Sequence, residues 1–173
     1  DANVRALSVQ GGCTTDDVFK MIERVRKHVK VPLVFLTYLN PVFKYGYDTF
    51  CKRCKEVGVD GFIIPDMPFE EKSELLPIAK QYDLDLITLV APTSKDRIQM
   101  ITKEATGYIY LVSSMGVTGV RNEISTEIEE IVQSIRAVSH TPIAVGFGIS
   151  TPEQASQYSQ MSDGVIVGSA IVK

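Results

Sequence analysis

The sequence has few cysteines, and they are poorly placed for covalent or metal chemistry. Only Cys13, Cys51 and Cys54 occur in 173 residues. Three are too few for a disulfide framework, which favours a reducing compartment. Cys51 and Cys54 have the spacing of a redox motif, but they fall well inside a predicted helix, whereas a redox pair is activated at a helix start. A zinc site would need further ligands, and only Cys13, His28 and His140 remain. We therefore expect no metal site, and inert cysteines buried on a helix.

The sequence also lacks a long hydrophobic run and a basic cluster. No apolar stretch approaches the ~18 residues that a membrane span needs, so no membrane association is expected. The first residues, DANVR, are polar, and we expect no signal peptide there. The net charge is −3, and aromatic residues are not interleaved with lysine and arginine, so nucleic acid is not an expected partner. The length and the 45% of hydrophobic residues fit a single globular domain over residues 1–173.

A regular alternation of predicted strands and helices runs through the whole chain. Apolar runs predict six buried strands, at 31–39, 61–65, 84–90, 108–112, 142–146 and 165–167. Helices are predicted between them at 48–57, 70–82, 96–105, 125–139 and 151–159, and another helix begins at Thr14 before the first strand. Strands that are apolar throughout are typical of a parallel sheet covered by helices. The sequence therefore predicts an α/β fold built of βα units.

Two architectures fit such repeats. An open, doubly wound sheet that binds a dinucleotide carries GxGxxG after its first strand. Here Gly146-Phe147-Gly148 has the first two glycines, but Thr151 takes the third position and the motif lies far along the chain, which argues against this fold. The other architecture is the (β/α)8 or TIM barrel, in which a phosphate site is commonly formed after strands 7 and 8. We favour the barrel.

Glycine-rich turns follow the last two predicted strands. Gly146-Phe147-Gly148 ends the first of them, and Gly168-Ser169 ends the second and opens a helix. Glycine lets backbone N–H groups approach an anion, and a helix start adds unpaired N–H groups and a positive dipole end. Each turn alone is explained by geometry, but the pair on successive strands predicts a phosphate site. The loop 113–119 (SSMGVTG) follows another strand and is a candidate lid.

The position of these turns also indicates which of the eight barrel strands the chain contains. If they follow strands 7 and 8 of a barrel, the first predicted strand is strand 3. Strands 3–8 are then present, whereas strands 1 and 2 and the last helix fall outside residues 1–173. Because a full barrel takes ~250 residues, we expect residues 1–173 to be part of a longer barrel.

Six motifs, spread in order over nearly the whole chain, resemble the α subunit of tryptophan synthase. They are LTYLNPVFKYG (36–46), VGVDGFIIPDMP (57–68), LVAPTS (89–94), GYIYLVSSMGVTG (107–119), VGFGIS (145–150) and DGVIVGSAIVK (163–173). The resemblance implies a cytoplasmic barrel enzyme that cleaves indole-3-glycerol phosphate to indole and glyceraldehyde 3-phosphate. It also implies a partner, the tryptophan synthase β subunit, which takes up the indole and holds pyridoxal phosphate. No cofactor is implied in this chain.

The same resemblance implies roles for matching residues. The phosphate ligands would be Gly119, Gly148, Gly168 and Ser169. The pocket and lid would be Tyr38, Tyr110, Thr118 and Phe147. The residues facing the β subunit would be Asn40, Pro41, Phe43, Asp66 and Pro68. Cleavage needs an acid that protonates indole C3 and a base that takes a hydroxyl proton of the glycerol chain. In the family these are a Glu and an Asp that match positions before residue 1, so no catalytic residue and no lyase activity are expected in residues 1–173 alone.

Asp66 is the carboxylate that would otherwise attract a catalytic role. It directly follows a predicted strand, where barrel enzymes place catalytic groups. It has no second carboxylate beside it, and the resemblance assigns it to communication with the partner.

Two alternatives remain open. One is a barrel isomerase or synthase that acts on another sugar phosphate, and the other is a non-catalytic fragment that only binds the β subunit.

Overall fold

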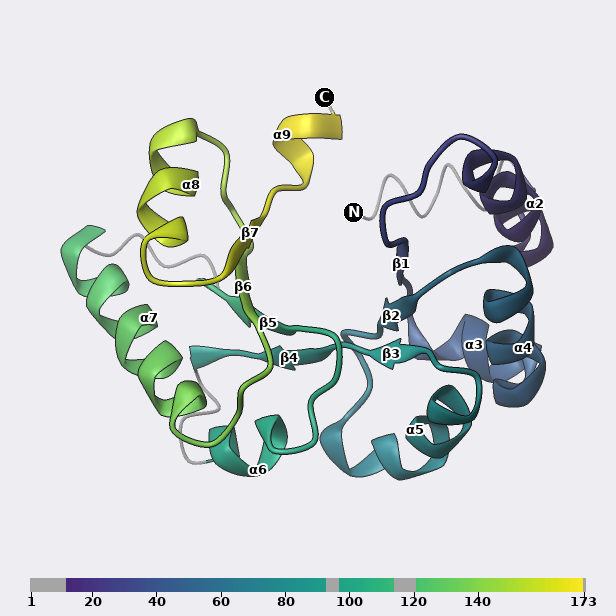
Figure 1. The fold of residues 1–173 in the computed structure, drawn as a ribbon, viewed down its shortest axis with the longest axis horizontal. Coiled ribbons are helices and arrows are strands. Elements are labelled where there is room, and N and C mark those ends of the chain that lie inside the picture. Colours follow the sequence, from purple (N-terminus) through teal and green to yellow (C-terminus); the bar gives the residue numbers. More distant parts are fainter. Residues whose placement is uncertain (1–11, 93–96, 114–120, 173) are drawn as a thin grey trace. The chain divides into compact units, whose positions relative to one another are not determined.

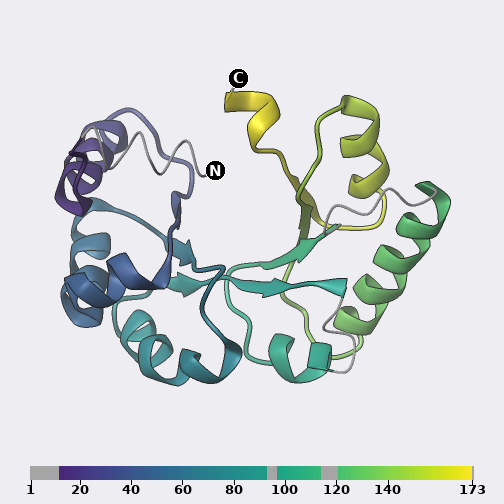
Figure 2. The ribbon, with the colours of Figure 1, turned by 180° about the vertical axis from the view of Figure 1, so that it is seen from behind.

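The chain divides into two compact units. The computed structural model describes residues 12–92, 97–113 and 121–172. One unit comprises Asp1–Asp85 and the other Leu86–Lys173. Figure 1 shows the ribbon, and Figure 2 shows it from behind. Within each unit, strands alternate with helices, as the apolar patterns predict.

The first unit is built on a sheet with the strand order β1-β2-β3. Its strands are β1 (Val34–Leu36), β2 (Gly61–Ile63) and β3 (Asp85–Leu86), the last at the boundary between the units. Its helices are α2 (Thr15–Arg26), α3 (Leu39–Tyr45), α4 (Tyr47–Val57), the 3-10 helix η1 (Phe69–Glu71) and α5 (Lys72–Gln81). β1 and β2 pair in parallel. In both views the helices lie on one side of these strands (Figures 1 and 2).

Aromatic side chains fill the core of the first unit. Phe19 on α2 is fully buried, and its ring centroid lies 5.7 Å from that of Phe35 on β1. Phe50 on α4 lies 5.6 Å from Phe19 and 5.8 Å from Phe62 on β2. Aromatic pairs of this kind contribute about 0.5–1.5 kcal/mol each beyond their buried area. The cluster therefore joins two helices to two strands.

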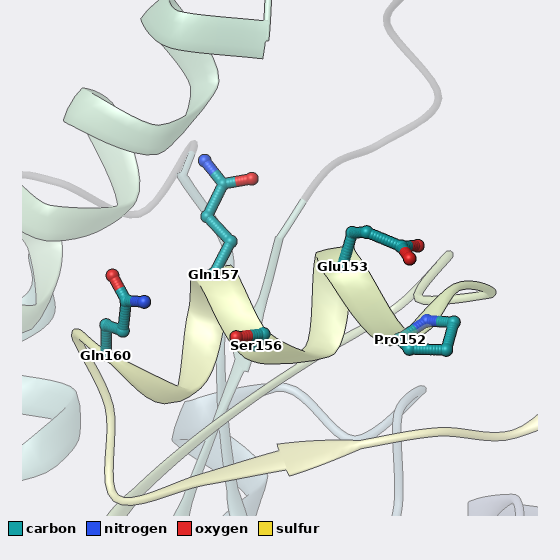
Figure 3. A pocket seen from close by; sticks show the side chains of 5 residues that line it. All are labelled: Pro152, Glu153, Ser156, Gln157 and Gln160. Carbon is teal, nitrogen blue, oxygen red and sulfur yellow. The ribbon is translucent and has the colours of Figure 1, made fainter.

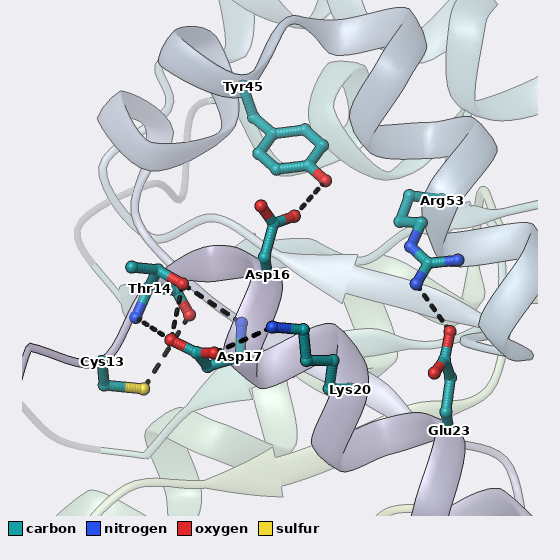
Figure 4. A network of polar contacts seen from close by, with 8 residues as sticks. All are labelled: Cys13, Thr14, Asp16, Asp17, Lys20, Glu23, Tyr45 and Arg53. Atoms are coloured by element: carbon teal, nitrogen blue, oxygen red, sulfur yellow. Dashed lines mark hydrogen bonds and ion pairs between the residues drawn. The ribbon is translucent and has the colours of Figure 1, made fainter.

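The predicted helix start at Thr14 is confirmed. The Asp17 N–H donates to the Thr14 hydroxyl oxygen (3.2 Å), and the Thr14 N–H donates to the Asp17 carboxylate (3.0 Å), which completes a capping box (Figure 4). The Thr14 hydroxyl, and after it the Thr14 backbone, lowers the pKa of Asp17. Beside this cap, the Tyr45 hydroxyl donates to Asp16 (2.6 Å) and links α3 to α2.

The prediction of a buried strand over 31–39 is wrong in both extent and burial. Only Val34–Leu36 form β1, and Leu36 is 68% exposed. Pro32 has no N–H to donate, and the Leu33 N–H donates to the Asp60 carboxylate (2.7 Å). Strand pairing therefore begins later than the apolar run does.

Helix α3 is not predicted from the sequence. Asn40-Pro41 reads as a loop because proline disrupts helix interiors. Here Pro41 is the third helical residue, where the backbone N–H would have no intrahelical acceptor. The helix therefore forms at no cost in hydrogen bonding.

The second unit contains a parallel sheet with the order β4-β5-β6-β7. Its strands are β4 (Thr88–Val90), β5 (Ile109–Val112), β6 (Ile143–Gly146) and β7 (Gly164–Ile166). Its helices are α6 (Ile98–Thr102), α7 (Arg121–Arg136), α8 (Pro152–Ser159) and α9 (Ser169–Val172). Helices α6, α7 and α8 lie on one side of the sheet (Figures 1 and 2).

The predicted strand over 84–90 is two strands. β3 belongs to the first sheet and β4 to the second, with Ile87 between them. Leu86, Ile87 and Thr88 are all buried, which explains why the run reads as continuous.

Among the described residues, no helix is long and apolar enough to cross a bilayer.

Candidate functional site

The two glycine-rich turns lie side by side at the carboxyl edge of the second sheet. β6 and β7 pair in parallel, with Gly146 opposite Ile166. Gly148 and Gly168 each lie two residues beyond that pair, and α9 begins at Ser169. Because neighbouring strands are about 4.8 Å apart, the backbones of both turns can contact one small anion.

The turns carry backbone N–H groups that are not used in backbone hydrogen bonds to the described residues around them. Within residues 97–113 and 121–172, no backbone carbonyl accepts the N–H of Gly148, Gly168 or Ser169. A Cβ added at Gly168 would meet no described atom within 4 Å, and this residue lies outside the left-handed backbone region. Neither packing nor backbone strain therefore requires glycine at position 168. Close approach of a ligand to the backbone would require it.

Tyr110 lies across the sheet face beside these turns. A Cβ added at Gly146 would fall 2.5 Å from Tyr110 Cε2 and 2.9 Å from Ile166 Cβ, so only glycine lets the ring take this position. Burial raises the pKa of the Tyr110 hydroxyl, which therefore stays protonated near neutral pH. The ring is half-buried, so it can contact the apolar part of a ligand.

Phe147 has an unusual backbone conformation. Its φ is +84°, and its side chain is 56% exposed. Gly148 follows with φ +75°. The buried Ser113, just after β5, donates its hydroxyl to the Phe147 carbonyl (2.6 Å) and its N–H to the Gly146 carbonyl (2.8 Å). Ser113 is the first residue of the predicted lid loop 113–119, but the sequence predicts no contact between its side chain and the turn after β6.

Three further residues are predicted to contact the substrate: Gly119, Thr118 and Tyr38. Gly119 and Thr118 fall outside the described residues, so their roles stay predictions. Tyr38 belongs to the first unit, where it is the N-cap residue of α3 and is 42% exposed.

All five residues predicted to face a partner are exposed on the first unit: Asn40, Pro41, Phe43, Asp66 and Pro68. Asp66 accepts a hydrogen bond from the Leu39 N–H (2.9 Å), which links the loop after β2 to the start of α3. The Phe43 ring is 65% exposed and lies edge-on to Tyr47 at 6.0 Å. An exposed aromatic ring on an anchored helix suits a protein partner.

Two depressions elsewhere contain none of the predicted substrate residues. One of ≈ 500 Å³ lies along α8, between the side chains of Pro152, Glu153, Ser156, Gln157 and Gln160 (Figure 3). The other, of ≈ 310 Å³, lies in the first unit between the start of α2 and β1.

The prediction of buried helix cysteines is confirmed for Cys51 and Cys54. Both are fully buried on α4, and neither forms a disulfide. Burial raises the pKa of Cys51 to about 11 and that of Cys54 further. Because the thiolate is the reactive form, this pair is not suited to redox chemistry. In the described ranges, no three His, Cys, Asp or Glu side chains gather in a way that could hold a metal.

The chain is similar to tryptophan synthase α chains along its whole length. The family described as "Tryptophan synthase alpha chain" matches residues 1–173. The tryptophan synthase alpha chain of Lacticaseibacillus casei is 50% identical over 171 residues, which cover 99% of this chain and 64% of the relative. Tryptophan synthase subunit alpha from Campylobacter jejuni has a TM-score of 0.89 at 35% identity, with 96% of this chain and 66% of that chain covered.

A structure of Mycobacterium tuberculosis tryptophan synthase has a TM-score of 0.87 at 36% identity, with 99% of this chain and 65% of that chain covered. The chain thus spans somewhat less than two thirds of the length of these relatives. The structural neighbours are (β/α)8 barrels, and the parallel βα units of this chain confirm the predicted fold class. The chain belongs to the tryptophan synthase alpha chain family.

Proposed function

We propose that the protein cleaves indole-3-glycerol phosphate to indole and glyceraldehyde 3-phosphate. Family membership supports the reaction. The observation that supports a phosphate-bearing substrate is the pair of turns after β6 and β7, where Gly148, Gly168 and Ser169 present N–H groups without a backbone acceptor among the described residues. Clustered backbone donors at a helix start suit a phosphate group. Gly119 is the fourth proposed phosphate ligand.

The reaction breaks the bond between indole C3 and the first carbon of the glycerol chain. An acid protonates C3, and a base removes the proton from the hydroxyl on that carbon. The electrons of the broken bond return to the indole ring, and the carbon becomes the aldehyde of glyceraldehyde 3-phosphate. We assign Tyr110 and Phe147 to the wall around the indole or the glycerol chain, with Tyr38 and the lid residue Thr118.

We further propose that the acid and the base are not supplied by residues 1–173. Asp66, the first carboxylate in the sequence after β2, accepts a hydrogen bond from the Leu39 N–H and is exposed. It is therefore engaged in structure rather than poised beside a second carboxylate. No cofactor is assigned to this chain, and pyridoxal phosphate is assigned to the β subunit.

The experiment measures the release of indole from indole-3-glycerol phosphate by the complete natural polypeptide. We expect turnover by that polypeptide and none by residues 1–173 alone. Turnover by residues 1–173 would overturn the assignment of the acid and the base. Turnover of other sugar phosphates, without release of indole, would favour the isomerase or synthase alternative.

We also propose that the β subunit binds the first unit through Asn40, Pro41, Phe43, Asp66 and Pro68. Their exposure supports this, as does the anchoring of Asp66 to α3. Phe43→Ala should weaken the affinity for the β subunit about tenfold or more, because exposed aromatic anchors dominate interfaces. Met21→Ala is the control, since Met21 is 44% exposed on α2 of the same unit. Equal affinities of the two variants would contradict the proposed surface.

The unpaired cysteines support a cytoplasmic location.

A further inference from the structure

Ser113 connects the end of β5 to the turn after β6. Its side chain is buried, at 4% exposure, and its hydroxyl donates to the Phe147 carbonyl at 2.6 Å. Its own N–H donates to the Gly146 carbonyl at 2.8 Å. One residue thus holds two successive carbonyls of the turn that carries Gly148.

The bond to Phe147 also sets the direction of a donor. The Phe147 carbonyl and the Gly148 N–H belong to one peptide unit, and the described chain contains no cis peptide bond. In a trans peptide these two groups point in opposite directions. Because the carbonyl is turned towards Ser113 at the end of β5, the Gly148 N–H is turned away from β5. β7 lies on that side of β6, and the turn at Gly168 and Ser169 follows it.

The conformation of Phe147 needs such support. A residue other than glycine with φ +84° stays in that region only when its surroundings hold it there. The Phe147 ring is 56% exposed, so its packing does not supply the constraint. The hydrogen bonds of Ser113 supply such a constraint, and Ile149, which follows Gly148, is buried at 5% exposure.

We infer that Ser113 is a positioning residue of the phosphate site, an inference that rests on the proposed function. Its hydroxyl fixes the peptide unit between Phe147 and Gly148 so that the Gly148 N–H faces the anion beside Gly168 and Ser169. Ser113 does not touch the substrate itself. It acts through the turn.

The test uses Ser113→Ala in the complete natural polypeptide, with inorganic phosphate as the probe. Binding is followed through the amide signal of Gly148 in 1H–15N NMR spectra. Loss of one hydroxyl-to-carbonyl bond should weaken phosphate binding about 3- to 10-fold. The KM for indole-3-glycerol phosphate should rise by a similar factor, with kcat unchanged. Ser113→Thr keeps the hydroxyl and should restore the affinity.

Ser162→Ala is the matched control. Ser162 is also buried, at 9% exposure, and its hydroxyl donates to the carbonyls of Tyr158 (2.7 Å) and Gly164 (2.9 Å). These bonds lie at the amino end of β7, so their loss should leave phosphate affinity unchanged. Equal weakening in both alanine variants, or none in Ser113→Ala, would overturn the role of Ser113. If added phosphate does not shift the amide signal of Gly148 in the unmodified protein, the proposed phosphate site is wrong, and so is the proposed role of Ser113.

Discussion

Asp60 and Asp163 hold corresponding positions in the two units. Each directly precedes a strand and accepts a hydrogen bond from the backbone N–H at the start of the preceding strand segment. The donor is Leu33 for Asp60 (2.7 Å) and Ile143 for Asp163 (2.9 Å). In return, the Asp60 N–H donates to the Leu33 carbonyl (2.8 Å), and the Asp163 N–H donates to the Ile143 carbonyl (2.9 Å). Each aspartate therefore sets the register at the amino ends of two strands.

The same two aspartates pair with equivalent arginines. Arg26 is the last residue of α2, and its Nη2 atom lies 2.5 Å from Asp60 Oδ2. Arg136 is the last residue of α7, and its Nη2 atom lies 3.3 Å from Asp163 Oδ1. The two units therefore repeat one arrangement: a helix that ends in arginine, a strand, and an aspartate before the next strand.

Removal of either aspartate should destabilise the fold. Asp60→Ala and Asp163→Ala should each lower the free energy of unfolding by about 1–3 kcal/mol, because a strand N–H loses its acceptor. Asparagine at either position keeps an acceptor and should cost less. Urea unfolding measures the change.

Glu56→Ala is the control for these variants. Glu56 is 49% exposed, close to the 47% of Asp60 and the 48% of Asp163, and it pairs with Arg53 at 3.3 Å. Among the described residues, its carboxylate accepts a hydrogen bond from Arg53 and none from a backbone N–H. The change should stay below about 0.5 kcal/mol. A loss in Glu56→Ala as large as in the aspartate variants would show that the ion pairs, not the strand contacts, carry the effect.

Gly146 should tolerate no side chain. Gly146→Ala places a Cβ 2.5 Å from the Tyr110 ring and should cost about 1–3 kcal/mol of stability as the ring is displaced. Gly164→Ala in the neighbouring strand brings its Cβ to 3.8 Å from Ala144 Cβ, an ordinary contact. It should change stability by less than about 0.5 kcal/mol. Thermal unfolding compares the two, and equal midpoints would contradict the close contact at Gly146.

The three cysteines should differ in their reaction with iodoacetamide. Cys13 is exposed, whereas Cys51 and Cys54 are fully buried and their pKa values are raised by burial. At pH 8 the folded protein should be alkylated at Cys13 alone, and urea should expose all three. Peptide mass spectrometry locates the label. Modification of Cys51 in the folded protein at the rate of Cys13 would show that α4 is not packed as described.

The stability contribution of Lys72 should depend on pH. Burial lowers its pKa from 10.5 to about 8. Between these values the unfolded chain binds more protons than the folded one, so stability rises with pH through this window. Below pH 8 both forms are charged, and the full cost of burying the charge is present. The stability of Lys72→Met relative to the unmodified protein should therefore be higher at pH 7 than at pH 10. Urea unfolding at both pH values checks this, and a stability difference that does not change with pH would refute it.

Local signals in the sequence predict two helix starts correctly, whereas α7 begins at Arg121 and not at the predicted residue 125. At Thr14 and Thr151 the cap and its partner lie three residues apart, so the pattern is visible without the fold. α3 could not be predicted in this way. The Asp66 carboxylate that binds its first N–H lies 27 residues further along the chain.

The candidate site, too, could be predicted only in part. Gly148 and Gly168 are predicted from the sequence because glycine directly after a strand indicates a turn where a ligand can approach the backbone. The role of Ser113 depends on the register between β5 and β6, which places Val112 opposite Gly146. Sequence alone does not fix that register.

The central claim is that the turns after β6 and β7 hold the phosphate of the substrate. The most direct test is the KM of Gly168→Ala for indole-3-glycerol phosphate in the complete natural polypeptide, with Gly164→Ala as the control. A Cβ at Gly168 meets no described atom within 4 Å, so the variant should fold normally and only the approach of a ligand should change. We expect its KM to rise about tenfold or more, with little change in the control. A KM of Gly168→Ala equal to that of the unmodified protein would contradict the account.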